Sequence, residues 1–559
     1  MRKLLLQLPV FLLLLLQFVS VGSFGQISDG GMPLSFGLKL PVAYHEVQII
    51  PPAREVIAGK VAPEQKTALP FQFAIILPVN VTTHNSGSWT YLEDGTRIWR
   101  LKLKSPNAKA IGLYFRNFNL PEGAKLFIYN TEKVLGAYTS KNNSESGLFA
   151  VELIHGDEVT VEMDIPAGIY KDPNFEIAEM DYAFRSVDEH MEGANQTSSG
   201  ECEVDVICTP EGDLWQDIKK GIVRIKVKVG SGAFWCTGTL INNTAFDQTP
   251  YILTADHCAF SGQYASDDNL QDWIFYFNYE VSDCGGSQVI ADNFSMTGAT
   301  RVASGGNHGL TGSDFYLVRL NNNIPADKIP KVYFSGWSAE TDVSNLGVSI
   351  HHPSGDVKKV STYSVPLIST TWLNNGVPSH WKVVWSETNN GWGVTEPGSS
   401  GSPLYDMNGR IRGTLTGGQA SCSQPDQPDY YGKFSWHWES NGTDDTLQLR
   451  PWLDPANTGQ TILGGQYFND TSENPEKAAN LIVWGTINDG VLRFKIPGIT
   501  KTDARVKMAD YSGKNVFDQQ VVIEGDAFTD IPISDLSSGF YLLSVTCDGK
   551  TTVKKIVKR

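Results

Sequence analysis

The chain is 559 residues long, with 41% hydrophobic and 19% charged residues, a composition typical of globular proteins and a length that suits about three or four domains. Its formal net charge is −16 at pH 7 and its pI is about 5.1. Because no stretch offers a sustained basic face to phosphates, we expect no nucleic-acid partner. An acidic protein instead favours basic partners, such as substrates that carry lysine.

The start of the chain has the three-part pattern of a secretory signal, so residues 1–25 are predicted to be a signal peptide. Arg2 and Lys3 give a positive start, an apolar run covers 4–21, and small residues end it. A membrane anchor is the alternative, although Pro9 interrupts the run. Later segments lack the roughly 18 uninterrupted apolar residues of a spanning helix. We therefore expect a secreted protein, extracellular or at the cell surface, without a transmembrane anchor.

Residues 26–200 are predicted to form a β-sandwich. Apolar and polar residues alternate over 98–103 and 125–129, and a further strand pattern covers 156–162. No titratable cluster in this unit indicates chemistry, so it is either a propeptide or a binding module. The stretch 186–200 is polar and rich in Ser and Gly, which suits an exposed cleavage site.

Residues 201–465 also show strand patterns with no helical patterns between them, which predicts an all-β barrel or sandwich domain. The clearest patterns are 222–229, which alternates along its whole length, 251–255 and 315–320. Residues 466–559 begin with a polar linker and continue with further strand patterns, which predicts a second, smaller β-sandwich.

Seven cysteines are present, and six of them lie between Cys202 and Cys422. An even set inside one segment of an exported chain predicts three disulfides. A zinc site is the alternative, but no C-x-x-C pair supports it. Cys547 is left over in a strand-like stretch, where we expect a buried thiol.

Ser400 is the candidate nucleophile, in the sequence Gly398-Ser399-Ser400-Gly401. Small residues permit a tight turn that exposes one hydroxyl, and they let a substrate approach the backbone closely. The N–H groups of Gly398 and Ser400 are then candidate donors of an oxyanion hole. An ordinary Gly/Ser loop between two strands is the alternative.

Two further segments supply the partners that a serine nucleophile needs. His257 lies in the sequence TADHC and Asp314 in GSDF, so the chain order is His, Asp, Ser. This is the order of the double β-barrel proteases, and the serine motif does not read G-x-S-x-G, which argues against an α/β-hydrolase. A core histidine at 257 and a turn cap at 314 are the structural alternatives.

Metal binding has little support in the sequence. His351 and His352 are adjacent, and neighbouring strand residues point to opposite faces, so they would not converge on one ion. Nothing resembles a nucleotide-binding loop or an EF-hand. We expect no metal and no cofactor.

These segments together resemble the chymotrypsin-like serine proteases, and among them the bacterial lysyl endopeptidases of the Achromobacter protease I type. The resemblance runs through most of residues 200–455. The motifs that carry it are CTGTL at 236–240, TADHC at 254–258, GSDF at 312–315 and TEPGSSGSPLYD at 395–406. The resemblance implies a chymotrypsin-like double β-barrel.

In this family the serine attacks the substrate carbonyl, the histidine takes its proton and the aspartate orients the imidazole, so the resemblance implies these roles for Ser400, His257 and Asp314. It also implies a disulfide pairing, which sequence alone does not settle. The implied pairs are Cys202–Cys422, Cys208–Cys284 and Cys236–Cys258.

The resemblance further maps substrate-binding residues onto the chain. Asp429 matches the pocket aspartate that selects a basic side chain, with Asp426 as the competing candidate. Trp372 matches a tryptophan beside the substrate. Thr416 stands where the family keeps a histidine that stacks on this tryptophan, which leaves the strictness for lysine over arginine open. Gly417 would let the substrate backbone lie close to the pocket wall.

The flanking units resemble known modules as well. Residues 26–200 resemble the prodomains of secreted bacterial proteases, and residues 466–559 resemble the C-terminal sorting domains of the type IX secretion system of Bacteroidota. We therefore expect a monomeric, secreted serine endopeptidase that cleaves proteins or peptides after lysine, with arginine left open, and that the type IX machinery exports. The alternative is a catalytically inert surface adhesin or binding module on a protease fold.

Overall fold

A computed structural model describes the chain from residue 28 to residue 558. The residues it does not describe within this range are 39, 41–43, 62–69, 187–198, 291, 374–375, 469–481, 484–489, 496–501, 511–513, 524–527 and 548–549. The predicted signal peptide and most of the predicted linker lie outside the described residues. In the part of the chain that is described, no helix is long and apolar enough to cross a membrane.

The N-terminal unit is a β-sandwich, as predicted. One sheet has the order β1-β4-β11-β7-β8, with β3 paired to β4, and consists of Glu46–Gln48 (β1), Ser88–Tyr91 (β3), Arg97–Lys104 (β4), Lys125–Tyr129 (β7), Val134–Tyr138 (β8) and Glu158–Ile165 (β11). The facing strands are Phe71–Thr82 (β2), Leu113–Asn119 (β6), Phe149–Ala150 (β9) and Asn174–Ala183 (β12). Trp99 of β4, Met163 of β11, Phe115 of β6 and Ile177 of β12 are buried in one core between the sheets. Helix α1 (Arg54–Val61) and the short pair β5 (Ala110–Ile111) and β10 (Ile154–His155) complete the unit.

Residues 201–465 form a central unit, and its first half is a sheet that closes on itself. Its strand path is β17-β16-β13-β14-β15-β19-β18, formed by Ile222–Val229 (β13), Gly232–Ile241 (β14), Tyr251–Thr254 (β15), Ile274–Phe277 (β16), Phe294–Thr297 (β17), Ala299–Ser304 (β18) and Tyr316–Leu320 (β19). Gly298 alone separates β17 from β18, so the two ends of the path meet. The short helix α2 (Asp267–Gln271) is capped by Ser266.

The second half is another curved sheet, with the path β22-β21-β25-β26-β27-β24-β23 and with β20 and β28 attached. Its strands are Gly336–Ser338 (β20), Gly347–His351 (β21), Lys359–Tyr363 (β22), Ile368–Thr370 (β23), His380–Val383 (β24), Pro403–Asp406 (β25), Arg410–Gly418 (β26), Asp429–Lys433 (β27) and Ile462–Leu463 (β28), followed or flanked by helices Phe434–Glu439 (α3) and Arg450–Leu453 (α4). Leu253 and Phe315 of the first half share a buried core with Val348, Tyr405 and Ile411 of the second. The central unit is therefore the predicted chymotrypsin-like pair of β-barrels.

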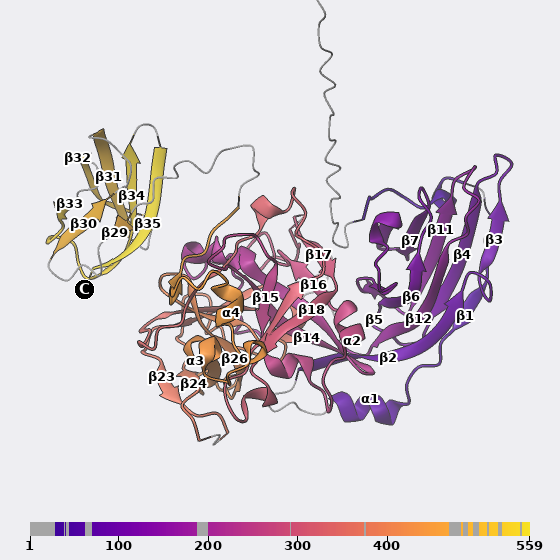
Figure 1. Cartoon of the computed structure of the whole chain (residues 1–559), viewed down its shortest axis with the longest axis horizontal. Coiled ribbons are helices and arrows are strands. Elements are labelled where there is room, and N and C mark those ends of the chain that lie inside the picture. The colour runs from indigo at the N-terminus through magenta and orange to yellow at the C-terminus, as the bar shows by residue number, and fades with distance from the viewer. Residues whose placement is uncertain are drawn as a thin grey trace, which may run out of the picture.

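The N-terminal sandwich and the first barrel share one continuous sheet. Strand β2 pairs antiparallel with β14, with Ala74 opposite Ala233 and Phe71 opposite Trp235, and Figure 1 shows β2 reaching from the sandwich toward β14. The alternating segment 222–229, which is β13, is buried along its whole length. The sandwich covers the face of β13 that would otherwise meet solvent.

The C-terminal unit is also all-β. Its two sheets, β29-β30-β33 and β32-β31-β34-β35, are formed by Ile482–Val483 (β29), Val491–Lys495 (β30), Thr502–Asp510 (β31), Asn515–Ile523 (β32), Thr529–Pro532 (β33), Gly539–Cys547 (β34) and Lys550–Lys558 (β35). Leu492, Val506 and Leu543 are buried in a core that both sheets share. Cys547, which lies outside the three disulfides, is buried, as predicted.

Candidate active site

His257 and Asp314 meet at one end of the first barrel. Strand β15 ends at Thr254, a short 3-10 helix (Asp256–Ala259) carries His257, and Asp314 lies just before β19. Strands β15 and β19 pair antiparallel, with Thr254 opposite Tyr316. The segment that follows β15 therefore lies beside the segment that precedes β19. His257 Nδ1 lies 2.6 Å from Asp314 Oδ2, and the backbone N–H of His257 donates to Asp314 Oδ1 at 3.1 Å.

Both side chains of this pair are fully buried. Burial alone would raise the pKa of Asp314, but the charge of His257 and the hydrogen bonds from its ring and backbone outweigh it, and the pKa lies below its ordinary value. Asp314 is therefore ionised at neutral pH. A carboxylate on Nδ1 fixes the tautomer that leaves Nε2 as the proton acceptor.

The second barrel holds the backbone of Asp314 in place. Thr414 of β26 donates its hydroxyl to the Asp314 carbonyl at 2.7 Å. His437 of α3 lies 3.0 Å from that hydroxyl through Nε2 and 2.7 Å from Ser313 Oγ through Nδ1. Burial lowers the pKa of His437 to about 3, so its ring is neutral and bridges the two hydroxyls. His437 lies in no recognisable sequence motif, because its partners become its neighbours only in the folded chain.

The turn that carries Ser400 packs against the end of β15. The Ser400 carbonyl accepts from the Thr237 backbone N–H at 2.8 Å, and the Cys258 sulfur lies 3.6 Å from the same oxygen. At Gly401, where φ is +80°, an added Cβ would lie 2.1 Å from the hydroxyl of Thr254. Glycine is therefore required at 401 to bring the Ser400 turn to the residues that precede His257.

Ser400 and the outer ring nitrogen of His257 are both available for chemistry. His257 Nε2 is buried and makes no hydrogen bond, and the Ser400 hydroxyl makes none with any described residue. The structure thus brings Ser400 next to the His257 segment, while the direct hydroxyl-to-imidazole hydrogen bond of the family is not formed in this conformation. Catalytic hydrogen bonds are often long without substrate and tighten in the complex.

Around Ser400, some backbone N–H groups donate a hydrogen bond within the protein and others do not. Ser399 donates to the Glu396 carbonyl and Gly401 donates to the Leu415 carbonyl. In the described part of the chain, the N–H groups of Gly398 and Ser400 have no acceptor. These are the two donors that the sequence proposed for an oxyanion.

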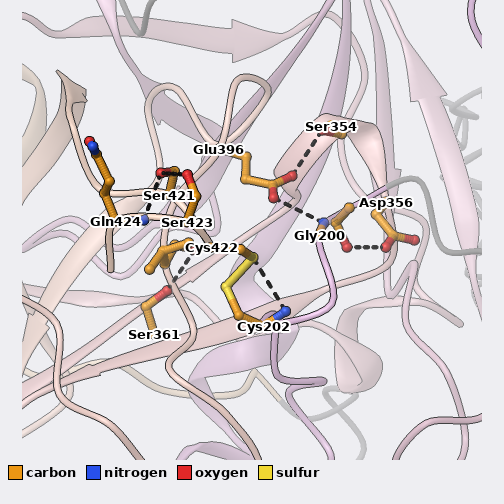
Figure 2. The surroundings of a disulfide bond; sticks show 12 residues. Gly200, Cys202, Ser354, Asp356, Ser361, Glu396, Ser421, Cys422, Ser423 and Gln424 are labelled. Atoms are coloured by element: carbon orange, nitrogen blue, oxygen red, sulfur yellow. Dashed lines mark hydrogen bonds between the residues drawn. A yellow bond between two sulfur atoms is a disulfide. The ribbon is translucent and has the colours of Figure 1, made fainter. Parts of the chain in front are cut away.

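Glu396 connects this turn to the start of the central unit. Its carboxylate accepts from the Gly200 backbone N–H at 2.9 Å and from the Ser354 hydroxyl at 3.0 Å, and Figure 2 shows it lying between the two. Beside it, Ser199 donates its hydroxyl to Asp356 at 2.5 Å. The segment around Gly200 therefore braces the loop that precedes Ser400.

The structure contains the three disulfides that the family resemblance implied: Cys202–Cys422, Cys208–Cys284 and Cys236–Cys258. The last joins β14 to the short helix that carries His257, and closing this loop reduces the freedom of the catalytic segment. Among the described residues, the grouping with metal-like spacing is Cys202, Glu203 and Cys422, but its two cysteines form a disulfide and cannot serve as thiolate ligands. His351 lies within hydrogen-bond distance of the hydroxyls of Ser399 and Ser361.

Asp429 is the buried acid of the candidate pocket, and Asp426 is exposed. Asp429 Oδ2 accepts from Trp385 Nε1 at 2.8 Å and from the Thr395 hydroxyl at 2.7 Å, and Oδ1 accepts from the Ala420 N–H at 3.2 Å. Thr395 begins the segment that leads to Ser400. The acid and the candidate nucleophile are therefore held by one stretch of chain.

Comparison with known proteins agrees with this arrangement. The model for the lysyl endopeptidase C-terminal domain matches residues 196–432, the model for the lysyl endopeptidase N-terminal domain matches 53–178, and the secretion system C-terminal sorting domain matches 488–559. A lysyl endopeptidase of Pseudomonas aeruginosa is 29% identical over 405 residues, which cover 69% of this chain and 83% of that protein. A beta-fibrinogenase of Macrovipera lebetinus is 23% identical over 223 residues, 37% of this chain and 77% of that protein.

The chain is a secreted serine endopeptidase, and two of its regions match lysyl endopeptidase domain models. Its sorting domain assigns it to export by the type IX secretion system. Two solved structures are also similar: the secreted serine protease VesC from Vibrio cholerae, with 11% identity, a TM-score of 0.28 and coverage of 61% of this chain and 68% of that one, and a serine endoprotease from Yersinia pestis, with 13% identity, a TM-score of 0.27 and coverage of 63% and 98%. At these TM-scores the likeness does not bear on the fold, which rests on the strand order.

The protease has a histidine beside Trp372 that was not predicted from the sequence. The rings of Trp372 and His380 lie 6.0 Å apart at 28°, and His380 Nε2 lies 3.1 Å from the Thr416 hydroxyl. Although position 416 is a threonine, Trp372 still has an imidazole stacked on it, which comes from His380 of β24. This replacement becomes visible only from the strand pairing, which places β24 and β26 on either side of β27.

Burial lowers the pKa of His380 to about 4, below the ordinary value near 6.5. The unfolded chain therefore binds a proton on this residue that the folded chain does not, and folding stability must fall as the pH decreases from about 6.5 to about 4. We predict that the free energy of unfolding of His380→Gln falls by about 3 kcal/mol less than that of the parent over this pH range. Urea unfolding at several pH values, in the Ser400→Ala background to prevent self-digestion, measures it.

His84→Gln is the matched control, because His84 is exposed on the N-terminal unit. Its pH dependence should equal that of the parent. If His380→Gln and the parent lose the same stability between pH 6.5 and pH 4, His380 is not held neutral by burial.

Proposed function

We propose that the protease hydrolyses peptide bonds on the carboxyl side of lysine through an acyl-enzyme on Ser400. The observation that carries this proposal is the buried His257–Asp314 pair, 2.6 Å apart, at the barrel end against which the Ser400 turn packs. Ser400 attacks the substrate carbonyl while His257 Nε2 takes its proton, and His257 then donates that proton to the leaving amine. Water releases the acyl group by the reverse sequence.

The N–H groups of Gly398 and Ser400 would receive the negative charge that develops on the carbonyl oxygen. Fixed donors of this kind need no reorganisation during the reaction, and each is worth roughly 2.7–4 kcal/mol of transition-state stabilisation. The positive φ of Gly398, +100°, and the close approach of the Ser354 and Gly355 backbone support the conformation that leaves its N–H unused.

Asp429 is proposed to bind the ammonium group of the substrate lysine. A buried carboxylate is costly to leave without a countercharge, so the pocket favours a basic side chain. Trp385, Thr395 and Ala420 hold its two oxygens in place. Lysine is proposed over arginine because a compact ammonium can bind one oxygen of such a carboxylate, whereas a guanidinium is bound best through two parallel hydrogen bonds.

The flanking units complete the proposal. Residues 26–200 are a propeptide that is separated by cleavage near 185–201, residues 201–465 are the catalytic unit, and residues 466–559 are the linker and sorting domain. The match of separate N-terminal, C-terminal and sorting models to 53–178, 196–432 and 488–559 supports this division.

Replacing Ser400 tests the nucleophile. We predict that Ser400→Ala lowers kcat on a lysyl amide by about 10⁶-fold, because the other two hydroxyls of this turn, those of Ser399 and Ser402, are hydrogen-bonded to His351 and Ser349. Ser423→Ala, an exposed serine of the same barrel, should retain full activity. Comparable turnover by Ser400→Ala and the parent would reject Ser400.

Replacing Asp429 tests the specificity. Asp429→Asn keeps the shape of the pocket and removes its charge, so kcat/KM on lysyl amides should fall by about 10³-fold or more, while Asp426→Asn on the exposed neighbour should have no effect. Assays on matched lysyl and arginyl amides read both the loss and the preference. An unchanged lysyl rate in Asp429→Asn, or a parent that prefers arginine, would contradict the proposed pocket.

A further inference from the structure

The loop between β18 and β19 lies over the buried carboxylate of Asp314. Gly309 is buried in this loop, although the next residue, Leu310, is 45% exposed. A Cβ added at Gly309 would lie 3.3 Å from the Cβ of Asp314 and 3.4 Å from two atoms of the His380 ring. The backbone of the loop therefore packs directly against both side chains and helps to keep water away from Asp314.

Residues 306–309 form a left-handed loop. Their φ angles are +69° at Gly306, +57° at Asn307, +52° at His308 and +75° at Gly309. Two of these residues carry a Cβ, and a residue with a Cβ disfavours positive φ and keeps it only where surrounding contacts impose it. Contacts from outside the left-handed loop must therefore hold it against Asp314.

Asp256, the residue before His257, supplies these contacts. Its side chain is fully buried, and Oδ2 accepts from the His308 backbone N–H at 3.1 Å and from the Tyr264 hydroxyl at 2.8 Å. The Tyr264 oxygen in turn accepts from the Asn307 backbone N–H at 3.1 Å. Burial and, after it, the charge of Asp256 raise the pKa of Tyr264, so its hydroxyl stays protonated and donates. Asp256 thus holds both non-glycine residues of the loop, one of them through Tyr264.

Aromatic packing joins the same two segments. The ring of His308 lies 3.9 Å from that of Phe260, which follows the short helix that carries His257. The ring of Tyr264 lies 5.2 Å from that of Phe260, and His308 Nδ1 lies 3.2 Å from Asp256 Oδ2. The segment after His257 and the left-handed loop therefore form one packed unit around the Asp256 carboxylate.

Asp256 makes these hydrogen bonds through one of its two oxygens. Its other oxygen, Oδ1, is buried and has no hydrogen-bond partner among the described residues. Both hydrogen bonds into the left-handed loop therefore need one acceptor atom, which the oxygen of a side-chain amide also provides. A role based on these hydrogen bonds predicts that asparagine, but not alanine, can replace Asp256.

We propose that Asp256 is a positioning residue of the protease, which acts by holding the left-handed loop against Asp314 and His380. The loop keeps the His257–Asp314 pair out of water and fixes one side of the His380 ring. Asp256 itself touches neither substrate nor reacting atoms in this assignment. Its effect on catalysis rests on the proposed roles of His257 and Asp314, whereas its effect on the loop does not.

Amide hydrogen exchange tests the loop without any need for activity. In full-length Ser400→Ala, adding Asp256→Ala should accelerate exchange in peptides covering 305–312 by about tenfold or more, because two hydrogen bonds that hold the loop are lost. Adding Asp256→Asn should change this exchange much less. Asp268→Ala, on an exposed acid of α2, is the matched control and should leave it unchanged. Equal exchange in Asp256→Ala and the parent would overturn the proposal.

Steady-state kinetics test the effect on catalysis. In the processed enzyme, Asp256→Ala should lower kcat on a lysyl amide by about 10- to 100-fold and change KM by less than about threefold, because positioning is lost and no substrate contact is removed. Asp256→Asn should recover most of the loss. Equal losses in the two variants would assign the effect to the charge and overturn the proposal. A parent that does not cleave lysyl amides would contradict the proposed function, and the exchange experiment would still decide whether Asp256 holds the loop.

Tyr264→Phe guards against a folding defect in Asp256→Ala. It removes the hydroxyl that connects Asp256 to Asn307 and leaves the hydrogen bond from the His308 N–H in place. Exchange in 305–312 should therefore increase and kcat should fall, each by a smaller factor than in Asp256→Ala. Thermal unfolding of every variant shows that the proteins compared are folded. Parent values for both quantities in Tyr264→Phe would contradict the assigned connection.

Discussion

The buried contact between His257 and Asp314 is the constraint around which the protease unit is organised. A carboxylate with no exposure to water is strongly destabilising unless it is paired and hydrogen-bonded. The surrounding fold provides both: the His257 ring and backbone N–H bind the carboxylate, and Thr414 holds the carbonyl of the same residue from the opposite barrel. His257 of the first barrel thus keeps Asp314 ionised, while Thr414 of the second barrel helps to hold its backbone in place.

The second barrel contributes the residues that we propose to recognise and attack the substrate. Its strands β24 to β27 carry His380, Thr416 and Asp429, and the segment before β25 carries Ser400. Thr395 hydrogen-bonds to Asp429 and is five residues before Ser400, so the position of the pocket acid and that of the nucleophile are linked through a short covalent path. Binding of a lysine side chain would therefore place its carbonyl relative to a hydroxyl whose position the same segment sets.

The sequence was most informative where function depends on a local turn. The glycines beside Ser400, the TADHC segment and the all-β class could be assigned from the sequence before the structure, whereas the disulfide pairing was implied only by the family resemblance. His380 and His437 could not, because their roles depend on strand pairing and helix packing between positions far apart in the chain. Each lies in a sequence context that carries no motif.

The segment 222–229 shows a different limit. Its alternation of apolar and basic residues is typical of a strand with one solvent-facing side, and the strand itself was predicted. Lys226 and Lys228 are nevertheless buried, because the outward face of β13 is covered by another domain that supplies Asp181, Glu179 and Tyr114. A pattern of hydrophobicity reports which residues share a face, whereas the partner of that face depends on tertiary structure.

The most direct test of the assigned chemistry is a crystal structure of the processed protease after reaction with a lysyl phosphonate ester, a probe that bonds to an activated serine. If Ser400 is the nucleophile and Asp429 receives the side chain, phosphorus will be bonded to Ser400 Oγ, one phosphoryl oxygen will lie within hydrogen-bond distance of the N–H groups of Gly398 and Ser400, and the lysyl ammonium will contact Asp429. An unmodified Ser400, or a lysyl side chain directed away from Asp429, would contradict the proposed mechanism.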